Sequence, residues 1–523
     1  MTKATLADWL DDLAARHGER EALVDGARRW TYAELAVTTE RIARGLVTVG
    51  VGKETRIGIL LPNRAEWLVT AFAGFRLGAL VVALNTFSPA PELRRSLVHA
   101  DVQLLVVQPR FLGHDYLARL GEMSPALPGD GGPLFVPEVP ALRRIFMVDD
   151  LERLAGAGES VPLEVVRALQ SEVAPAELAT VFFTSGTTAA PKAPLHDHAA
   201  LVHQAGVLAE AFGYTPDDRW WAALPLFFTG GFVTGALATF AAGATIVLQA
   251  GPDPDAALDL IQHERPTILI GSNLVPALLE HPRLAGTPVA FRKGMAGNTP
   301  IIAKFCPADH LCVGTYGMSE TATCVTSTRA TDPVAVRRGS NGRPLTGVVL
   351  RVVDPASGEP APSGVDGEIL VRGPSLMRSY YGLEPQDCFD AEGFFHTGDL
   401  GHLDADGSLH FTGRLRDVIK SAGATVSPAE VEAALERHSQ VHAACVVPAP
   451  DPVRGEVVVA FVVADPGVDE EALRAYCRRE LAVYKVPRHF FLRSETDFPR
   501  TGTRKPDKLR LRREAAALLG AAT

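Results

Sequence analysis

The stretch TVFFTSGTTAAPKA, residues 180–193, joins an apolar run to a turn rich in hydroxyl side chains. Its apolar run ends at Phe183, and small hydroxyl residues, one glycine and one lysine follow. After a buried strand, such a turn can direct backbone N–H groups and hydroxyl donors at an anion. The stretch is not a Walker A loop, because the spacing G-x-x-x-x-G-K-S/T is absent. Taken alone, it fits a phosphate-binding loop and a Ser/Thr-rich surface loop equally well.

Length, composition and charge narrow the class of protein. A chain of 523 residues predicts one large domain and at least one smaller domain. Its 47% hydrophobic and 21% charged residues are typical of a globular enzyme. A net charge of −10 argues against a general nucleic-acid binder. Six cysteines without a CxxC pair predict reduced, buried thiols rather than a zinc or disulfide framework.

Targeting and membrane segments are not expected. The N-terminal stretch is amphipathic and acidic and lacks the apolar core of a signal peptide, so we expect a cytoplasmic protein. Residues 230–251 carry no charge and are long enough to cross a bilayer. Because this segment is rich in Gly, Ala and Thr, it predicts a buried helix followed by a buried strand.

The first part of the chain alternates between strand and helix patterns. Thr31 and Glu34 have the spacing of a capping box before a helix over residues 32–48. Further elements are expected as strands at 56–61, 80–85, 104–108 and 144–148, and as helices at 65–79 and 197–212. This alternation predicts parallel sheets covered by helices, and the Pro/Gly-rich residues 121–140 predict a surface loop.

The character of the sequence changes near residue 340. Alternating strands at 349–354 and 367–373 predict an antiparallel β subdomain. Near the C-terminus, Ser427, Pro428 and Glu430 predict an N-cap, a first-turn proline and a capping-box glutamate. The sequence therefore predicts an α/β protein. We expect a large N-terminal domain over residues 1–415, with layered sheets, helices and the β subdomain, and a small α/β domain over 416–523.

Four further motifs carry groups suited to nucleotide chemistry. In TYGMSE, residues 315–320, Tyr316 can stack on a base and Glu320 can hold Mg²⁺. Asp399 ends the motif HTGD and can accept hydrogen bonds from a ribose diol. GRLRD begins with Gly413 and Arg414, and PRTGTRK ends at Lys505. Each motif alone is also compatible with a solvated surface.

In this order and spacing, the motifs resemble the adenylate-forming family of acyl-CoA synthetases, aryl-acid ligases, luciferases and peptide-synthetase adenylation domains. The resemblance runs from about residue 5 to 515. It implies that a carboxylate attacks the α-phosphate of ATP, giving an acyl adenylate and pyrophosphate, after which a thiol displaces AMP. It further implies ATP and Mg²⁺ as cofactors, coenzyme A as co-substrate, and a small domain that rotates about a hinge.

The resemblance also implies roles for individual residues. Catalytic roles fall on Thr184, Glu320 and Lys505, and Glu320 also holds Mg²⁺. ATP and AMP contacts fall on Thr184, Ser185, Gly186, Thr187, Thr188, Lys192, Gly297, Asn298, Thr299, Tyr316, Gly317, Met318, Ser319, Asp399 and Arg414. The hinge falls at Arg416, and the thiol tunnel at Lys420, Ser421 and Gly423.

The acyl pocket is implied by LPLFFTGGF, residues 224–232. Phe228 stands where amino-acid-activating members carry an aspartate, and it cannot pair with an amine. The expected lining comprises Phe228, Thr229, Gly231, Phe232, Met318 and Val325. These side chains predict a hydrophobic carboxylic acid as substrate, although Phe227 and Phe228 also fit a core.

Three positions depart from the family pattern, because Ala189, Ala193 and Arg504 replace glycines. Alanine at a positive φ costs on the order of 1 kcal/mol. The loop can keep its shape with negative φ, bind ATP more weakly, or support only one half-reaction. We expect the first outcome, because the other motif residues remain.

The acceptor of the acyl group is not fixed by the motifs. A carrier-protein thiol or a partner enzyme can replace CoA, and a nucleotide-binding scaffold without catalysis also stays open, as does a homodimer. His196 and His198 lie two positions apart and cannot share a helix face, so no metal site is expected there. The basic tail, residues 500–513, suits the phosphates of ATP and CoA rather than nucleic acid.

Overall fold

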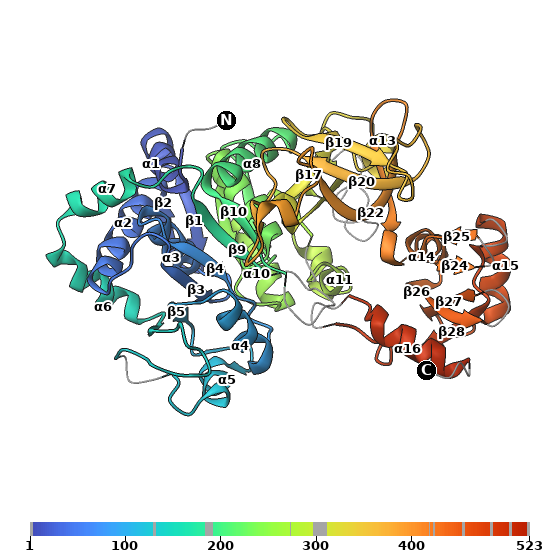
Figure 1. The fold of residues 1–523 in the computed structure, drawn as a ribbon, viewed down its shortest axis with the longest axis horizontal. Helices are drawn as coiled ribbons and strands as arrows, with labels where there is room; N and C mark the ends of the chain where they lie inside the picture. Colours follow the sequence, from blue (N-terminus) through green and yellow to red (C-terminus); the bar gives the residue numbers. More distant parts are fainter. Residues whose placement is uncertain are drawn as a thin grey trace. The chain divides into compact units, whose positions relative to one another are not determined.

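The computed structural model describes most of the chain in ten segments (Figure 1). The described residues are 4–128, 132–183, 192–271, 274–295, 311–417, 419–421, 424–451, 455–481, 485–501 and 505–519. They form two compact units, one of Met1–Leu350 with Val371–Phe395, the other of Arg351–Leu370 with His396–Thr523. The domain boundary expected at residues 415 and 416 stays a prediction.

The first unit contains a seven-stranded sheet in the order β21-β10-β9-β4-β3-β5-β8. Its strands are β3 (Arg56–Leu60), β4 (Leu80–Ala83), β5 (Leu104–Val107), β8 (Arg144–Met147), β9 (Leu178–Phe182), β10 (Pro194–Asp197) and β21 (Ser379–Tyr380). The five strands from β9 to β8 are parallel, β10 is antiparallel to β9, and the edge strand β21 is antiparallel to β10. Strands predicted from short apolar runs are therefore confirmed, and parallel pairing buries them on both faces.

A second seven-stranded sheet has the order β15-β14-β13-β11-β12-β1-β2. Its strands are β1 (Glu21–Asp25), β2 (Arg28–Thr31), β11 (Arg219–Ala222), β12 (Thr245–Leu248), β13 (Ile268–Ile270), β14 (Lys293–Met295) and β15 (Leu311–Val313). The N-terminal β1 lies parallel to β12, with Leu23 opposite Ile246. The chain therefore crosses from one sheet to the other early on, because β1 and β3 are close in the sequence but belong to different sheets.

Helices cover these sheets. They are α1 (Leu6–His17), α2 (Tyr32–Thr48), α3 (Ala65–Arg76), α4 (Ala90–His99), α5 (Tyr116–Met123), α6 (Asp150–Ala157), α7 (Leu163–Ser171), α8 (His198–Ala211), η2 (Gly230–Leu237), α9 (Ala238–Ala241), α10 (Pro254–Glu264), α11 (Leu274–Leu279) and α13 (Val334–Gly339). The predicted capping box is confirmed, since Thr31 Oγ1 accepts from Glu34 N and the Glu34 carboxylate accepts from Thr31 N. Thr5 and Asp8 form a second box at α1.

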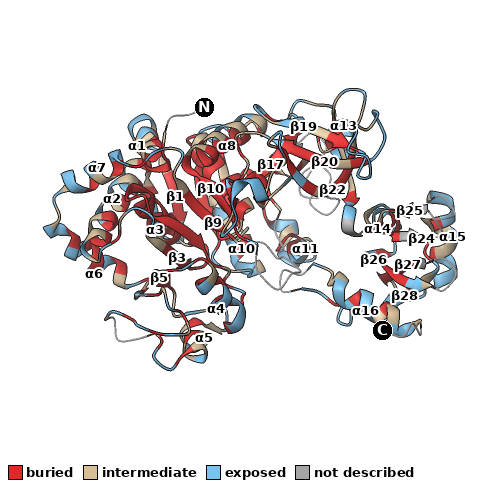
Figure 2. Ribbon diagram, viewed as in Figure 1, coloured by how far each residue is buried: buried red, intermediate tan, exposed pale blue. Residues whose placement is uncertain are grey.

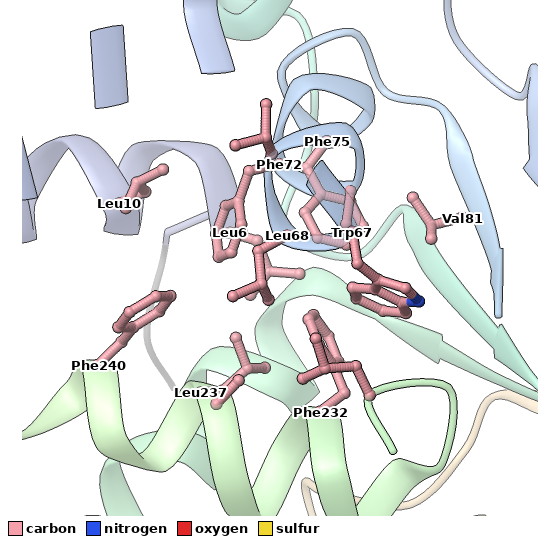
Figure 3. Close-up of a cluster of buried hydrophobic side chains, with 14 of the residues drawn as sticks. Leu6, Leu10, Trp67, Leu68, Phe72, Phe75, Val81, Phe232, Leu237 and Phe240 are labelled. Atoms are coloured by element: carbon pink, nitrogen blue, oxygen red, sulfur yellow. The ribbon is translucent and has the colours of Figure 1, made fainter. Parts of the chain in front are cut away.

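The main core lies where α3 meets η2 and α9 (Figure 3). Trp67 and Phe75 of α3 pack against Phe232, with ring centroids 5.2 and 6.4 Å apart, and Phe72 lies 6.3 Å from Phe240. All five rings are almost fully buried. Figure 2 shows the same burial along the central strands. This interface fixes the element that follows the expected acyl-pocket turn.

The uncharged stretch 230–251 forms η2, α9 and β12, as predicted, and nearly all of it is buried. Within the described ranges, no helix is both long and apolar enough to cross a membrane. The surface loop predicted at 121–140 is partly wrong. Its first residues belong to α5, and its buried apolar side chains, Leu127, Leu134, Val136 and Val139, join the core beside β5.

The second unit has two sheets. One has the order β19 (Val349–Val353), β20 (Gly367–Arg372), β22 (Phe395–Leu403) and β23 (Leu409–Arg414), with β22 and β23 antiparallel. The other contains β24 (Ile419–Ser421), β25 (Ala424–Val426), β26 (Val441–Asp451), β27 (Gly455–Ala464) and β28 (His489–Arg493). Helices α14 (Pro428–Glu436), α15 (Glu470–Glu480) and α16 (Lys508–Leu518) complete the α/β arrangement predicted for the C-terminal part.

The capping box predicted at the start of α14 is wrong. Ser427 is the N-cap residue and Pro428 opens the helix, but the Ser427 side chain makes no cap hydrogen bond. Its Oγ donates instead to the carbonyl of Thr412. The Glu430 carboxylate accepts from Lys485 Nζ at 2.6 and 2.7 Å. Two tertiary contacts therefore replace the local pattern.

His198 begins α8 inside the main core. Its Nδ1 accepts from the backbone N of Leu6 at 3.3 Å, and its ring packs edge-on against Phe75. Burial lowers the pKa of His198 from 6.5 to about 4, and the negative charges of Glu177 and Asp8 offset only part of this effect. The imidazole is therefore neutral at physiological pH.

This burial makes stability depend on pH. The folded pKa lies below the unfolded value of 6.5, so the unfolded state binds the extra proton between pH 6.5 and about 4. Acidification from pH 7 to pH 5 should therefore cost about 2 kcal/mol of unfolding free energy through His198 alone. In His198→Asn, the amide oxygen can replace Nδ1 as the acceptor. Denaturant unfolding of this variant should show an unfolding free energy that falls by about 2 kcal/mol less between pH 7 and pH 5 than in the wild type. His263→Asn, at an exposed histidine of α10, is the control and should match the wild type. Equal pH dependence of all three proteins would contradict the assignment.

Candidate active site

The motif TYGMSE forms a strained hairpin. Strand β16 (Thr315–Met318) leads through the turn η4 (Ser319–Thr321) into β17 (Thr323–Ser327), and the two strands are antiparallel. Ala322 and Thr323 follow the turn with φ angles of 47° and 84°, a region that non-glycine residues avoid. Backbone strain of this kind is often retained at functional sites. At Gly317 an added Cβ would lie 1.8 Å from the Thr323 carbonyl oxygen, so only glycine fits.

Glu320 lies in this turn and is held from two directions. Its carboxylate Oε1 accepts a hydrogen bond of 2.7 Å from the Tyr380 hydroxyl. Its backbone carbonyl accepts from Met377 N at 2.8 Å. The residue is 9% exposed, so only a small part of it reaches the surface. Both its backbone and its side chain are thus fixed by the segment around β21.

Lys192 also contacts Tyr380. Its ammonium group is 5.0 Å from the centroid of the Tyr380 ring, and Nζ lies 3.5 Å from the hydroxyl oxygen. The structure therefore brings Lys192 and Glu320, two predicted site residues, to the same tyrosine. Sequence reasoning missed Tyr380, because its motif MRSYYG contains no pattern that indicates chemistry; pairing of β21 with β10 brings it to the site.

His196 supports the same turn. Its Nε2 donates to the Ser319 carbonyl at 2.8 Å, and the ring is completely buried. Burial lowers the pKa of His196 to about 4, so the ring is neutral and keeps one nitrogen protonated for this bond. In the described part of the chain, no cluster of three or more His, Cys, Asp or Glu side chains is arranged to hold a metal ion.

The Glu320 carboxylate fits the expected magnesium ion. Mg²⁺ binds hard oxygen ligands and is usually held by one or two carboxylates together with substrate phosphates and water. A single carboxylate, fixed at one oxygen by a neutral phenol, matches this mode of binding. The ion, when bound, would neutralise charge on the phosphate oxygens of ATP.

Much of the predicted nucleotide site lies outside the described residues. This holds for Thr184, Ser185, Gly186, Thr187, Thr188, Ala189, Gly297, Asn298, Thr299 and Arg504. Ala193 is described and buried, and its carbonyl accepts from Tyr381 N at 2.8 Å. It is not among the described non-glycine residues with positive φ, so alanine causes no left-handed strain there. Tyr316 is buried, whereas Met318 and Ser319 are half-buried.

The turn expected to line the acyl pocket is built on Asn63. This buried amide donates from Nδ2 to the carbonyls of Ala222 and Leu224 at 2.7 and 3.0 Å, and its Oδ1 accepts from Leu226 N at 2.8 Å. Phe228 follows in the turn, half-buried against Phe227, with ring centroids 4.4 Å apart. Asn63 is a second residue that sequence reasoning missed, since it lies 159 or more positions before its partners.

Other predicted pocket residues are packed more deeply. Thr229 and Val325 are buried, and Phe232 lies in the main core, 6.0 Å from Phe182. At Gly231 an added Cβ would lie 2.0 Å from the Pro225 carbonyl oxygen, so glycine permits the close approach of this turn. Of the predicted lining, Phe228 and Met318 are the half-buried side chains.

In the second unit, Asp399 and Arg414 are paired across β22 and β23. They lie opposite each other in the sheet, and Arg414 Nε is 2.7 Å from Asp399 Oδ1. Asp399 is 2% exposed, and its backbone N donates to Thr397 Oγ1 at 3.0 Å. Two residues predicted to contact the nucleotide therefore form an ion pair across the sheet.

The remaining predictions fall on the C-terminal segment. Lys505 is exposed and precedes α16, and its carbonyl accepts from Thr501 N at 2.7 Å. Arg416 lies in the turn Leu415–Asp417, and Lys420 and Ser421 lie in β24; only their backbones are described. Gly423 lies outside the described residues. The hinge and the thiol tunnel stay predictions.

The role of Asn63 can be tested directly. Asn63→Ala leaves the Leu226 N–H and two carbonyls without their partner, so unfolding should become easier by about 2 to 3 kcal/mol. Asn85→Ala, which removes one hydrogen bond to Phe87 N in an exposed turn, should cost less than about 1 kcal/mol. Denaturant unfolding of both variants is the measurement. Equal losses would contradict a special role for Asn63.

Comparison with known proteins identifies the family. Residues 10–381 match the AMP-binding enzyme family, and residues 430–505 match the AMP-binding enzyme C-terminal domain. The chain is 33% identical to an indoleacetate–CoA ligase of Aromatoleum aromaticum, covering 96% of each chain. It is 32% identical to a feruloyl-CoA synthase of Amycolatopsis, covering 98% of this chain and 99% of the relative.

A solved structure shows the same fold. ATP-bound MatB from Rhodopseudomonas palustris superposes with a TM-score of 0.82 and 27% identity, covering 97% of this chain and 98% of MatB. The matched family regions contain the Glu320 hairpin, Lys192 and Lys505, which were predicted from the motifs. The chain therefore belongs to the AMP-binding enzyme family, as an adenylate-forming member of the acyl-CoA synthetase type.

Proposed function

We propose that this acid–CoA ligase acts on a hydrophobic carboxylic acid. The class of reaction follows from the family, whose members of this type use ATP, Mg²⁺ and CoA. The observation that carries the substrate proposal is Phe228, half-buried against Phe227 in the turn held by Asn63. The segment Leu224–Phe232 contains no charged side chain, so an amino or a second carboxylate group would find no partner on it.

The reaction proceeds in two steps. A carboxylate oxygen of the acid attacks the α-phosphorus of ATP, and the bond to pyrophosphate breaks. The sulfur of CoA then attacks the acyl carbon, the thiol proton is released, and AMP leaves as the acyl–phosphate bond breaks. Glu320 would hold the magnesium ion, and the cations of Lys192 and Lys505 would balance phosphate charge in the first step.

The ribose contact is proposed for the paired residues of the second unit. Asp399 carries a buried carboxylate, and its pairing with Arg414 supports a fixed orientation toward a diol. Gly423 would border the path of the thiol, where a side chain would obstruct it. A carrier-protein acceptor, a homodimer and a cytoplasmic location stay predictions.

One assay can test both the class of acid that is activated and the acceptor of the acyl group. Pyrophosphate release should occur with fatty, aryl or polycyclic acids and not with free amino acids, because the pocket turn offers no partner for an ammonium group. Adding CoA should convert the adenylate to a thioester, detected by mass spectrometry. Release with amino acids would overturn the hydrophobic assignment, and adenylate that never reacts with CoA would favour another acceptor.

Lys505 should act mainly in adenylation. Removing its charge takes away a stabilising contact to the transition-state phosphate, so Lys505→Ala should lower kcat of adenylation by roughly 100-fold or more. Transfer to CoA from a pre-made acyl adenylate should change less than about threefold. Arg512→Ala, which removes an exposed cation of α16, is the control for lost charge. Equal loss of both steps in Lys505→Ala would count against this role.

A further inference from the structure

Tyr380 contacts two residues of the active site that the sequence places far apart. Its hydroxyl donates to Glu320 Oε1 at 2.7 Å, and its ring lies 5.0 Å from the ammonium group of Lys192. One side chain thus touches the proposed magnesium ligand and a proposed phosphate-binding cation. Among the described residues, Tyr380 is not part of the two largest core clusters.

The backbone around Tyr380 is fixed at several points. Strand β21 pairs with β10, where Tyr380 lies opposite Pro194. The backbone N–H groups of Met377, Arg378 and Tyr381 donate to the carbonyls of Glu320, Leu195 and Ala193, each at 2.8 Å. The segment is therefore tied to the Glu320 turn and to the strand that follows Lys192. A side chain on such a segment can hold a constant position between them.

The neighbouring tyrosine has a different role. Tyr381 follows β21 directly, and its side chain has its own hydrogen-bond partners. Its hydroxyl donates to Asp101 at 2.8 Å and accepts from Arg56 Nε at 3.0 Å. Tyr381 therefore makes two polar contacts of similar kind that do not involve Glu320 or Lys192. It offers a matched control for the loss of a phenol hydroxyl.

We propose that Tyr380 is a positioning residue for the first half-reaction. Its hydroxyl holds Oε1 of Glu320, so that the carboxylate presents its other oxygen to the magnesium ion of MgATP. Its ring face holds the Lys192 ammonium beside that carboxylate through a cation–π contact. The proposal rests on the proposed function, since it assigns Tyr380 a task in the binding of the nucleotide substrate.

The two contacts predict different effects for two substitutions. Tyr380→Phe removes the hydroxyl, and with it the 2.7 Å hydrogen bond to Glu320 and the long 3.5 Å contact to Lys192, but it keeps the ring face. Because the contact to Lys192 is the weaker of the two, binding of MgATP should weaken about tenfold, while binding of metal-free ATP should change less than about twofold. Tyr380→Leu also removes the ring beside Lys192, so binding of metal-free ATP should weaken as well, by about three- to fivefold. Thioester formation from a pre-made acyl adenylate should stay within about twofold of the wild type in both variants.

Calorimetric titration with ATP, in excess Mg²⁺ and in EDTA, measures these affinities without turnover. Tyr381→Phe is the control: it should keep wild-type MgATP affinity, although it loses two hydrogen bonds and should lower the melting temperature at least as much as Tyr380→Phe. Tyr380→Phe with wild-type MgATP affinity, or Tyr381→Phe with the same loss, would overturn the proposal. A wild-type protein that binds MgATP but activates no acid would contradict the proposed function, and the Tyr380 comparison would still stand.

Discussion

The contact between α3 and η2 is the constraint on which the first unit depends. Trp67, Phe72 and Phe75 project from α3, whose neighbours β3 and β4 belong to one sheet, toward Phe232 and Phe240, which precede β12 of the other sheet (Figure 3). Burying rings of this size contributes roughly 2 kcal/mol or more each. Because η2 begins directly after the Phe228 turn, the same packing that joins the two sheets also fixes one wall of the proposed acyl pocket.

Around this core, the candidate active site is held by polar contacts between distant segments. Asn63 fixes the pocket turn, His196 fixes the Ser319 carbonyl, and Tyr380 joins Glu320 to Lys192. Each of these side chains is buried or half-buried, where a lost hydrogen bond costs more than at the surface. The positive φ angles of Ala322 and Thr323 follow the turn that His196 and Tyr380 hold, and such strain is kept only where surrounding contacts support it.

Local patterns in the sequence predicted several helices and strands correctly. The helix over Tyr32–Thr48, with its capping box, and the strands at Arg56–Leu60 and Leu104–Val107 were all predicted from side-chain periodicity and capping residues. The failures are equally informative. The capping box expected at Ser427 is absent, because Ser427 Oγ donates to the Thr412 carbonyl and the Glu430 carboxylate accepts from Lys485 Nζ. In both cases a hydrogen bond to a distant residue replaces the local hydrogen bond to the backbone of the helix.

The family and the class of reaction could be predicted from the motifs alone, because those motifs are contiguous and their spacing is visible in one dimension. Only the tertiary structure decided that β1 joins β12 rather than β3, and that Tyr380 lies against Glu320, 60 positions away. Such contacts leave no local signal, since a hydrogen bond between distant segments depends on how the sheets are assembled. The physical reason is that periodicity reports which face of an element is buried, but not which other element covers it.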